Sequence, residues 1–468
     1  MSSKLGALGG NDFFHRCAAA HAAAVASGSP VLVSARLRGG VPEDPGDLRA
    51  RAPRTFHWRS SWTGRSMLGL GTAADLPATG PDRFARLAAG VRGLCATGEE
   101  PVLVGGFSFH AREERSHWLP DCLFWVPEAL WQRDEKGRAF WTLSTVVRPE
   151  EDPAHAAVRA LRWLRPGSGA RAPVAGSTPL HVDEGAGRAE WDRLVGQALD
   201  AIGAGVLDKV VTARALPVSA PRPFHVPRLL ARLEAGCREG AVFAVRDRER
   251  WFVGATPERL LSRRDDEITT VGLAGSAPRS VDPAADAELG RALFSDDKIR
   301  REHDYTAAYL VDRIASRCTG VQVAGPELTA LPTVQHLRTR VRATAPAGPG
   351  AFLDLLADLH PTPAVGGVPP DRAAAWLADA ESFDRGWYAG GVGWLRPSGD
   401  GEIGLAIRSA EVSGNTALVY AGCGVVAGST AAREWQETRW KTRPMLSALA
   451  ESVLAESERR ARVLAPTR

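Results

Sequence analysis

The sequence predicts an α+β fold whose sheets are mainly antiparallel. Short apolar runs alternate with turns rich in glycine, proline and charge along most of the 468 residues, and many neighbouring runs are spaced like hairpins. Single helical segments separate these runs, whereas a doubly wound fold would place a helix after each parallel strand. Apolar residues make up 44% and charged residues 24% of the chain, as in globular proteins with a sizeable core.

The first part of the chain supplies mainly strands separated by loops. The strand-like runs are PVLVSARL (30–37), PVLVGGFSF (101–109), CLFWVPEAL (122–130) and AFWTLSTVV (139–147). The stretch around 165–180, RPGSGARAPVAGSTP, is the best candidate for a linker because glycine, proline and small polar residues dominate it.

The second part mixes helices with longer strands. We expect helices over 189–205, 223–236 and 292–317, and another from Ala431 that breaks near Pro444. We expect strands at the segment containing Lys209 and over 241–247, 250–256, 259–264, 268–275, 333–343, 390–396, 403–411 and 416–426. No repeat at a fixed short period is visible.

Charge and cysteine content exclude several classes of protein. The net charge is +4 with basic and acidic residues interspersed, which argues against a nucleic-acid binder but allows a local cationic site for an anionic small molecule. The six cysteines form no CxxC pair, so we expect neither a disulfide framework nor a zinc site. No apolar run is long enough to span a membrane, and Asp12 and Arg16 interrupt the weak signal-like N-terminus. These features predict a cytoplasmic protein.

A lysine lies within an apolar strand pattern, DKVVTARAL (208–216). Alternation along a strand places Lys209 on the same face as Val211 and Ala213, with Arg214 on the other face. The ordinary explanation is a strand-end lysine whose stem packs while its ammonium reaches water. The alternative is a desolvated amine whose lowered pKa lets it act as a base near neutral pH.

Two glutamates, Glu258 and Glu302, likewise have both a structural and a functional interpretation. Glu258 follows a Thr-Pro corner in FVGATPERLL, where it is either a surface turn residue or a general acid at the edge of a cleft. Glu302 lies in KIRREHDY, four residues after Lys298, a spacing that suits an ordinary helical ion pair. The alternative for Glu302 is one carboxylate of a divalent cation site.

The segment REWQETRWK (433–441) combines acids with a lysine. Glu434, Glu437 and Lys441 share one face of the expected helix, either as a surface salt-bridge ladder or as part of a site. The preceding YAGCGVVAGST is a buried strand running into a glycine-rich turn, and a helix N-terminus beside such a turn favours anions. This pattern is compatible with magnesium and an anionic ligand. Arg408, in the expected strand GLAIRSAEV, is either an edge residue or an inward fork for a carboxylate.

Ten motifs occur in an order that resembles the chorismate-utilising enzymes. This family includes isochorismate, salicylate and anthranilate synthases and aminodeoxychorismate synthase. The motifs are KVVTAR, FVGATPERL, GLAGSAPR, KIRREHDY, VQHLRTRVRA, LHPTPAVGGVP, FDRGWYAGGVGW, AIRSAEV, YAGCGVVAGS and EWQETRWK. The resemblance implies an anthranilate synthase component I-like α+β fold, with two packed antiparallel sheets surrounded by helices. It also implies a chorismate-binding catalytic core over 189–464 and a divergent N-terminal part of the same unit over 1–188.

Within that family the resemblance favours the isochorismate synthase branch. Lys209 stands where ammonia-using anthranilate synthases carry glutamine, and LHPTPAVGGVP replaces the GAPK-like segment of aminating relatives. A salicylate synthase, which also eliminates pyruvate, is the alternative, followed by a chorismate-aminating subunit and a catalytically silent binding partner. The pathway that would use the product (menaquinone, a siderophore, salicylate or another metabolite) stays open.

The resemblance also assigns roles to individual residues. Lys209 is implied as the general base that activates water for attack at C2 of chorismate, and Glu258 as the general acid for the C4 hydroxyl. Mg²⁺ is the implied cofactor, held by Glu302 and Glu437 with Glu434 nearby. The implied substrate contacts are Gly275, Ser276, His336, Ala364, Val365, Arg408, Gly422 and Lys441. The branch implies a monomer without an obligate glutaminase.

Overall fold

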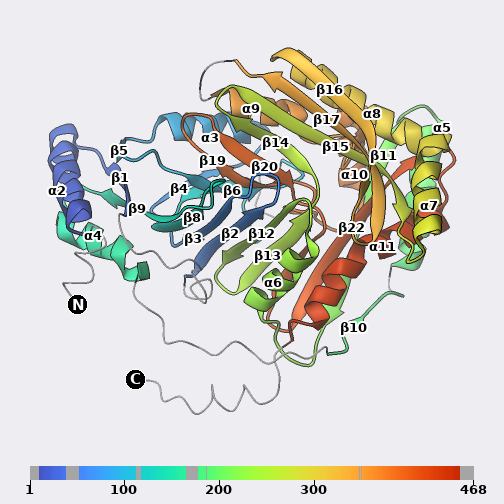
Figure 1. The fold of residues 1–468 in the computed structure, drawn as a ribbon, viewed down its shortest axis with the longest axis horizontal. Helices are drawn as coiled ribbons and strands as arrows, with labels where there is room; N and C mark the ends of the chain where they lie inside the picture. The colour runs from blue at the N-terminus through green and yellow to red at the C-terminus, as the bar shows by residue number, and fades with distance from the viewer. Residues whose placement is uncertain are drawn as a thin grey trace.

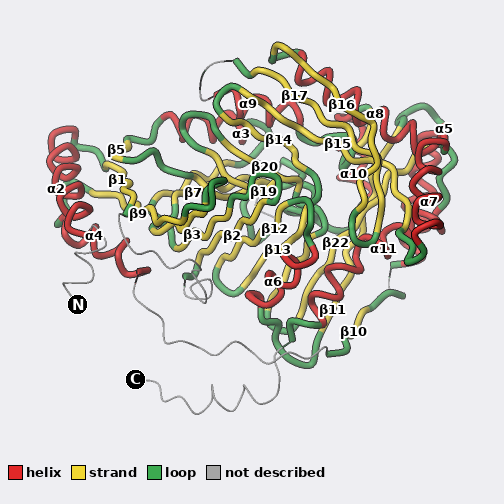
Figure 2. The backbone as a smooth tube through the Cα atoms, viewed as in Figure 1, coloured by secondary structure: helices red, strands yellow, loops and turns green. Residues whose placement is uncertain are grey.

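The strands of the protein form two large sheets that pack against each other, with the helices at the periphery (Figures 1 and 2). The computed structural model describes residues 10–37, 52–111, 117–164, 178–185, 187–346, 348 and 350–453. The predicted α+β class, with two packed sheets surrounded by helices, is confirmed.

The larger sheet has thirteen strands and contains the strand of Lys209. In spatial order it consists of β10 (His181–Val182), β11 (Lys209–Ser219), β22 (Thr416–Val426), β21 (Ser409–Ser413), β13 (Arg250–Thr256), β12 (Ala241–Asp247), β2 (Arg54–Ser60), β3 (Ser66–Leu70), β8 (Ala129–Arg133), β9 (Ala139–Val147), β1 (Val31–Arg36) and β5 (Ala96–Gly98), while β18 (Gly367–Val368) pairs with β11 outside this path.

The smaller sheet has nine strands. Its order is β16 (Thr319–Ala330), β17 (Val334–Thr344), β15 (Glu267–Pro278), β14 (Arg259–Arg264), β20 (Gly401–Leu405), β19 (Gly391–Leu395), β6 (Leu103–Phe107), β7 (Cys122–Val126) and β4 (Ala74–Ala78). Among the described strands, β1 and β5 form the one parallel pair, and the other pairs are antiparallel.

Helices cover the outer faces and the ends of the sheets (Figure 1). They are α2 (Gly10–Ser27), α3 (Arg83–Arg92), α4 (Pro153–Leu161), the short 3₁₀ helix η2 (Arg162–Leu164), α5 (Arg188–Gly203), α6 (Val226–Gly236), α7 (Pro283–Ser295), α8 (Asp297–Ala315), α9 (Gly350–Leu359), α10 (Pro370–Ala380) and α11 (Ala431–Ala450). No helix in the described ranges combines the length and apolar character needed to cross a membrane.

A large apolar core lies between the two sheets. Its largest members include Trp58 and Phe252 of the thirteen-stranded sheet and Trp125 of the nine-stranded sheet, all completely buried. Three smaller clusters lie outside it: one joins α2 and α4 to β1 and β9, another joins α6 and α11 to β12 and β13, and a small third joins α7 to β15 and β17. The central core holds together strands from both ends of the sequence.

The structure corrects several predicted boundaries. The helix expected over 292–317 is two helices, because Asp296 is extended and its carboxylate accepts hydrogen bonds from the backbone N–H groups of Lys298 and Ile299. The helix from Ala431 does not break near Pro444, since α11 runs through this proline to Ala450. The alanine-rich N-terminus forms α2, and β16 was not predicted.

Two other predictions concern the N-terminal part. Of the linker expected around 165–180, residues 165–177 lie outside the described residues. Strands that precede residue 188 belong to both sheets, with β2 paired to β12 and β6 paired to β19. The boundary between 188 and 189 stays a prediction.

Candidate active site

Lys209 is completely buried at the start of β11. Its Nζ lies 3.5 Å from Oε1 of Glu302 and 3.4 Å from the Glu302 carbonyl oxygen, both on α8. Burial lowers the pKa of Lys209, and the carboxylate of Glu302 only partly offsets this effect. The interpretation as a strand-end lysine with its ammonium in water is therefore wrong, and the amine loses a proton more readily than an exposed lysine does.

Glycines on the neighbouring strand make room for this lysine. In the register of β11 and β22, Gly424 lies opposite Val211 and Gly422 lies opposite Ala213. A Cβ atom on Gly424 would lie 2.3 Å from Oε1 of Glu302 and 3.1 Å from Cε of Lys209. The first contact is shorter than real Cβ atoms show and the second is tight, so the absence of a side chain at Gly424 permits the approach of Lys209 to Glu302.

Glu258 is a buried carboxyl group rather than a surface turn residue. It follows β13, and its backbone N–H donates to Oγ1 of Thr256, which fixes the corner. One carboxyl oxygen accepts the backbone N–H of Leu273 at 3.3 Å. Burial raises the pKa of Glu258 to about 8, against smaller opposing effects of that hydrogen bond and of Lys209. Glu258 therefore keeps its proton at neutral pH.

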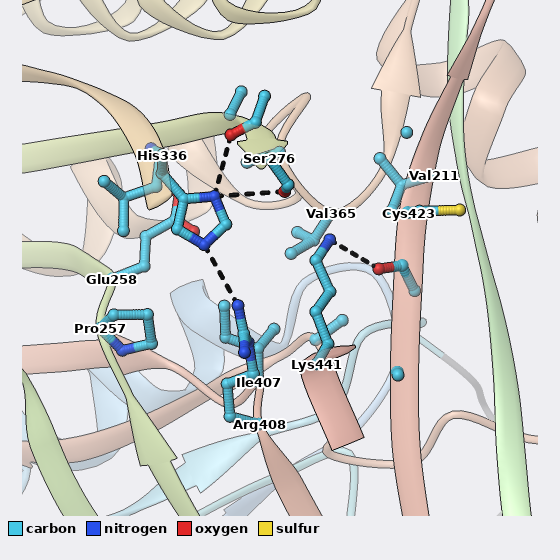
Figure 3. Close-up of a pocket in the computed structure, with 18 of the residues that line it drawn as sticks. Val211, Pro257, Glu258, Ser276, His336, Val365, Ile407, Arg408, Cys423 and Lys441 are labelled. Carbon is cyan, nitrogen blue, oxygen red and sulfur yellow. Dashed lines mark hydrogen bonds between the residues drawn. The ribbon is translucent and has the colours of Figure 1, made fainter. Parts of the chain in front are cut away.

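His336 links Arg408 to the strand that carries Gly275 (Figure 3). Nδ1 of His336 lies 2.9 Å from the carbonyl oxygen of Gly275 and 3.2 Å from Oγ of Ser276, while Nε2 lies 3.1 Å from an Nη of Arg408. Burial, together with the charges of Arg408 and Lys441, lowers the pKa of His336 to about 3. The neutral ring thus donates from Nδ1 to Gly275 and accepts from Arg408 at Nε2.

Arg408 does not lie within a strand, contrary to the prediction for 403–411. It stands between β20 and β21 with a positive φ of 53°, at the point where the chain passes from the smaller sheet to the larger one. Burial lowers the pKa of Arg408 to about 10, a range in which it remains a cation at neutral pH. A left-handed turn at this residue is what directs the guanidinium inward, toward His336.

The acids of α11 are paired with lysines inside the protein. Nζ of Lys441 lies 2.7 Å from Oε1 of Glu437 and donates to the carbonyl oxygen of Gly422 at 2.9 Å. Glu434 is 1% exposed and pairs at 2.6 Å with Lys298 of α8. The surface ladder considered for this helix is therefore wrong. The predicted ion pair of Lys298 with Glu302 along the helix is also wrong. Lys298 pairs with Glu434, and Glu302 pairs with Lys209.

Most of the predicted site residues line one cavity between the two sheets. The lining includes Glu258, Gly275, Ser276, Glu302, His336, Ala364, Val365, Arg408, Gly422 and Lys441. Lys209, Glu434 and Glu437 do not line it. Each of these three residues instead forms an ion pair: Lys209 with Glu302, Glu437 with Lys441, and Glu434 with Lys298. Glu302 and Lys441 themselves line the cavity. The cavity thus has a protonated acid on one side, cations on another and apolar side chains elsewhere.

Three carboxylates gather beside this cavity. Burial lowers the pKa of Lys298, but the charges of Glu434, Glu302 and Glu437 together outweigh burial and raise it. Burial raises the pKa of Glu434, and the nearby Glu437 raises it further. The cluster therefore favours a cation, and carboxylate oxygens are the ligands that Mg²⁺ prefers. As placed in the described part of the chain, no three such side chains converge closely enough to hold a metal ion.

Sequence reasoning missed two tyrosines that line the same cavity. Tyr388 and Tyr420 stack with their ring centroids 5.0 Å apart. Both occur in motifs noted in the sequence, FDRGWYAGGVGW and YAGCGVVAGS, but nothing in those motifs signals that the rings meet. Their stacked pair forms an aromatic part of the wall near Gly422, whose Cβ would lie 3.0 Å from the Tyr388 hydroxyl.

A buried ion pair clamps the free edge of β11 and was also missed. Arg385 donates to the carbonyl oxygens of Val211 and Val365 at 2.6 and 2.9 Å and pairs with Glu381. Glu381 in turn accepts the backbone N–H of Ala213 at 2.9 Å. β18 pairs only with Lys209 and Val210 of β11. The two side chains supply hydrogen-bond partners for the Val211 carbonyl and the Ala213 N–H, which lie beyond that pairing. The clamp joins the strand of Lys209 to the segment of Val365.

Comparisons of the chain with known proteins identify its relatives. Residues 47–450 match the family model described as chorismate binding enzyme. The chain is 33% identical to the salicylate biosynthesis isochorismate synthase of Pseudomonas aeruginosa, with 90% of each chain covered. It is 35% identical to isochorismate synthase MenF of Bacillus subtilis, with 75% of this chain and 74% of that protein covered.

A solved structure agrees with these relatives. The menaquinone-specific isochorismate synthase MenF of Escherichia coli superposes with a TM-score of 0.74 at 25% identity, covering 90% of this chain and 95% of that one. Anthranilate synthase component I of Streptococcus pneumoniae, at 21% identity and a TM-score of 0.65, shares the fold. The match to the family model spans most of the sequence, including the cavity, and the chain therefore belongs to the chorismate-binding enzyme family.

Proposed function

We propose that this protein is an isochorismate synthase, which converts chorismate reversibly into isochorismate. Water adds at C2 of the ring, the double bonds shift and the C4 hydroxyl leaves as water, so that substrate and product have the same composition. The observation that carries the proposal is the joint burial of Lys209 and Glu258, with a lowered lysine pKa and a raised glutamate pKa. The names of the relatives support the same activity.

The two groups have complementary roles. Lys209, as a neutral amine, accepts a proton from the attacking water, and Glu258 donates its proton to the departing C4 hydroxyl. The two lie close enough that each charge shifts the pKa of the other. Val211 lines the same cavity as Glu258 and adds an apolar side chain to its wall, which limits the access of bulk water to these groups.

The remaining predicted residues would hold the substrate. Arg408 and Lys441 offer cations for the two substrate carboxylates, with His336 orienting Arg408 and Ser276 beside it. The backbone near Gly275 and Gly422 supplies further polar groups. Ala364 and Val365 line the cavity as apolar contacts for the ring.

Mg²⁺ is the proposed cofactor, held by Glu302 and Glu437 with Glu434 close by. When bound, the ion would supply positive charge to the ring carboxylate of the substrate. Glu302 and Glu437 pair with Lys209 and Lys441 through Oε1. We further propose a cytoplasmic monomer that needs no glutaminase.

Proton NMR of chorismate incubated with the purified protein, with and without Mg²⁺, tests the function. A Mg²⁺-dependent mixture of chorismate and isochorismate without pyruvate is the expected result. Stoichiometric pyruvate with salicylate would assign a salicylate synthase, and turnover only with ammonium would assign an aminating enzyme.

Lys209→Gln should lose water addition yet retain chorismate binding, whereas full turnover by this variant would refute the role of Lys209 as the general base. Alanine variants of Glu302 and Glu437 should lose activity together with the response to Mg²⁺.

A further inference from the structure

A broad groove adjoins the active-site cavity at its cationic side. Pro257, Arg408 and Lys441 line both, so the groove opens onto the two cations proposed to bind substrate carboxylates. The groove has a volume of about 930 Å³ and lies between the end of α6, residues 279–281, residues 330–333 and α11. Helices α6 and α11 lie side by side there (Figure 1). We call this feature the entrance groove.

The entrance groove carries an excess of positive charge. Its lining includes Arg232, Arg238, Arg279, Arg408, Lys441 and Arg443, against the two acids Glu239 and Glu451. Arg232 pairs with Glu451 at 2.9 Å and Arg279 with Asp286 at 2.8 Å. Arg238 and Arg443 are exposed and have no ion pair or hydrogen bond within the described residues.

Arg443 distinguishes the entrance groove from a second basic groove, which shares Arg238 with it. The second groove crosses the nine-stranded sheet and is also rich in arginine. Several of its arginines, however, are paired, for example Arg340 with Glu327 at 2.7 Å and Arg264 with Glu135. Charges that are already paired contribute little field at a distance. The unpaired charges of Arg443 and of the shared Arg238 lie at the opening that leads to Arg408.

We propose that the entrance groove is an electrostatic capture site for the dianionic substrate, with Arg238 and Arg443 as its principal charges. The inference rests on the proposed function, because chorismate carries two carboxylates. Clefts lined by one sign of charge raise the local concentration of an oppositely charged ligand and its association rate. Salt screens this attraction over about 8–10 Å at physiological ionic strength. The groove therefore acts on substrate capture and not on the chemical step.

Steady-state kinetics at different ionic strengths test this assignment. The double variant Arg238→Gln/Arg443→Gln should lower kcat/KM for chorismate about tenfold in roughly 25 mM NaCl, with kcat changed far less. In about 400 mM NaCl the variant and the wild type should converge, because salt screens the same charges. The matched control is Arg86→Gln/Arg92→Gln, which removes two exposed arginines of α3, on a different part of the surface. This control should keep the salt dependence of the wild type.

A third variant tests the sign of the effect. Glu451→Gln removes an acid from the groove and frees Arg232, so it should raise kcat/KM in low salt and leave high-salt values unchanged. If the wild type turns over chorismate while the double variant keeps its salt dependence, the capture site is refuted and the proposed function stands. If the wild type does not turn over chorismate, the proposed function fails and the capture site fails with it.

Discussion

Glu258 and Lys209 carry their unusual proton affinities because both are buried, and the charge of each only partly offsets the shift of the other. Burial disfavours the charged form of either group, which raises the pKa of the carboxyl and lowers that of the amine. These opposite shifts favour a protonated carboxyl and a neutral amine in the same site.

The pH dependence of activity should reveal Glu258. Because Glu258 must be protonated to act as the acid, kcat/KM should fall as pH rises through about 8. Glu258→Gln should lower kcat by about 10²–10⁴-fold and remove this falling limb from the residual activity. Rate profiles between pH 5 and 10 measure both effects. An unchanged falling limb in the variant would assign it to another group.

Thermal stability should report the same group independently of catalysis. The pKa of Glu258 is raised from 4.5 to about 8 on folding, so its contribution to stability is complete below pH 4.5 and is lost as pH rises through 8. Glu258→Gln cannot ionise. The Tm of the variant minus the Tm of the wild type should therefore be larger at pH 8 than at pH 5. A Tm difference that does not vary with pH would contradict the burial of an ionisable carboxyl at this position.

At the scale of elements, the glycines of β22 let this strand pass close to Lys209 and Glu302. Gly424→Ala would place a methyl group 2.3 Å from Oε1 of Glu302. We expect the carboxylate to move away and kcat to fall by about 10²-fold, since small displacements of catalytic groups have such effects. Steady-state assays measure the change in kcat, and circular dichroism checks that the variant is folded. Gly196→Ala in α5, where nothing lies within 4 Å of the added methyl, is the control and should retain full activity.

The clamp on β11 should contribute mainly to stability. Arg385→Leu would leave the buried Glu381 without its partner and remove two hydrogen bonds to backbone carbonyls. We expect a loss of about 3–5 kcal/mol in the free energy of unfolding, measured with urea. Adding Glu381→Gln should recover part of this loss, because the unpaired charge is then absent. Fully additive losses would show that the two side chains do not act as a pair.

At the scale of the whole molecule, both sheets depend on strands from the N-terminal part. β2 pairs with β12 along seven residues, and β6 pairs with β19 along five. Residues 189–468 alone would expose both of these strand edges and part of the central core. We expect this fragment to lack a cooperative thermal transition in calorimetry. A cooperative transition would instead support the boundary between 188 and 189 as a boundary of folding.

The sequence by itself determined the fold class and most strands, and it predicted a set of site residues. The apolar runs of β11, β12 and β13 are local signals, because they are visible in the order of neighbouring residues. The ordered motifs then implied Lys209, Glu258 and Arg408 together, and the structure brings these residues to one region. The roles that the motifs implied for them remain proposals.

Only the tertiary structure decided how those residues are paired and oriented. Lys298 contacts Glu434, 136 residues away, rather than Glu302 four residues along its own helix. Arg408 leaves the strand pattern at a left-handed turn because the chain changes sheets there. The Arg385–Glu381 clamp likewise exists only because β11 has a free edge at Val211 and Ala213. Such contacts depend on the packing of distant elements and on burial, which local patterns in a sequence do not encode.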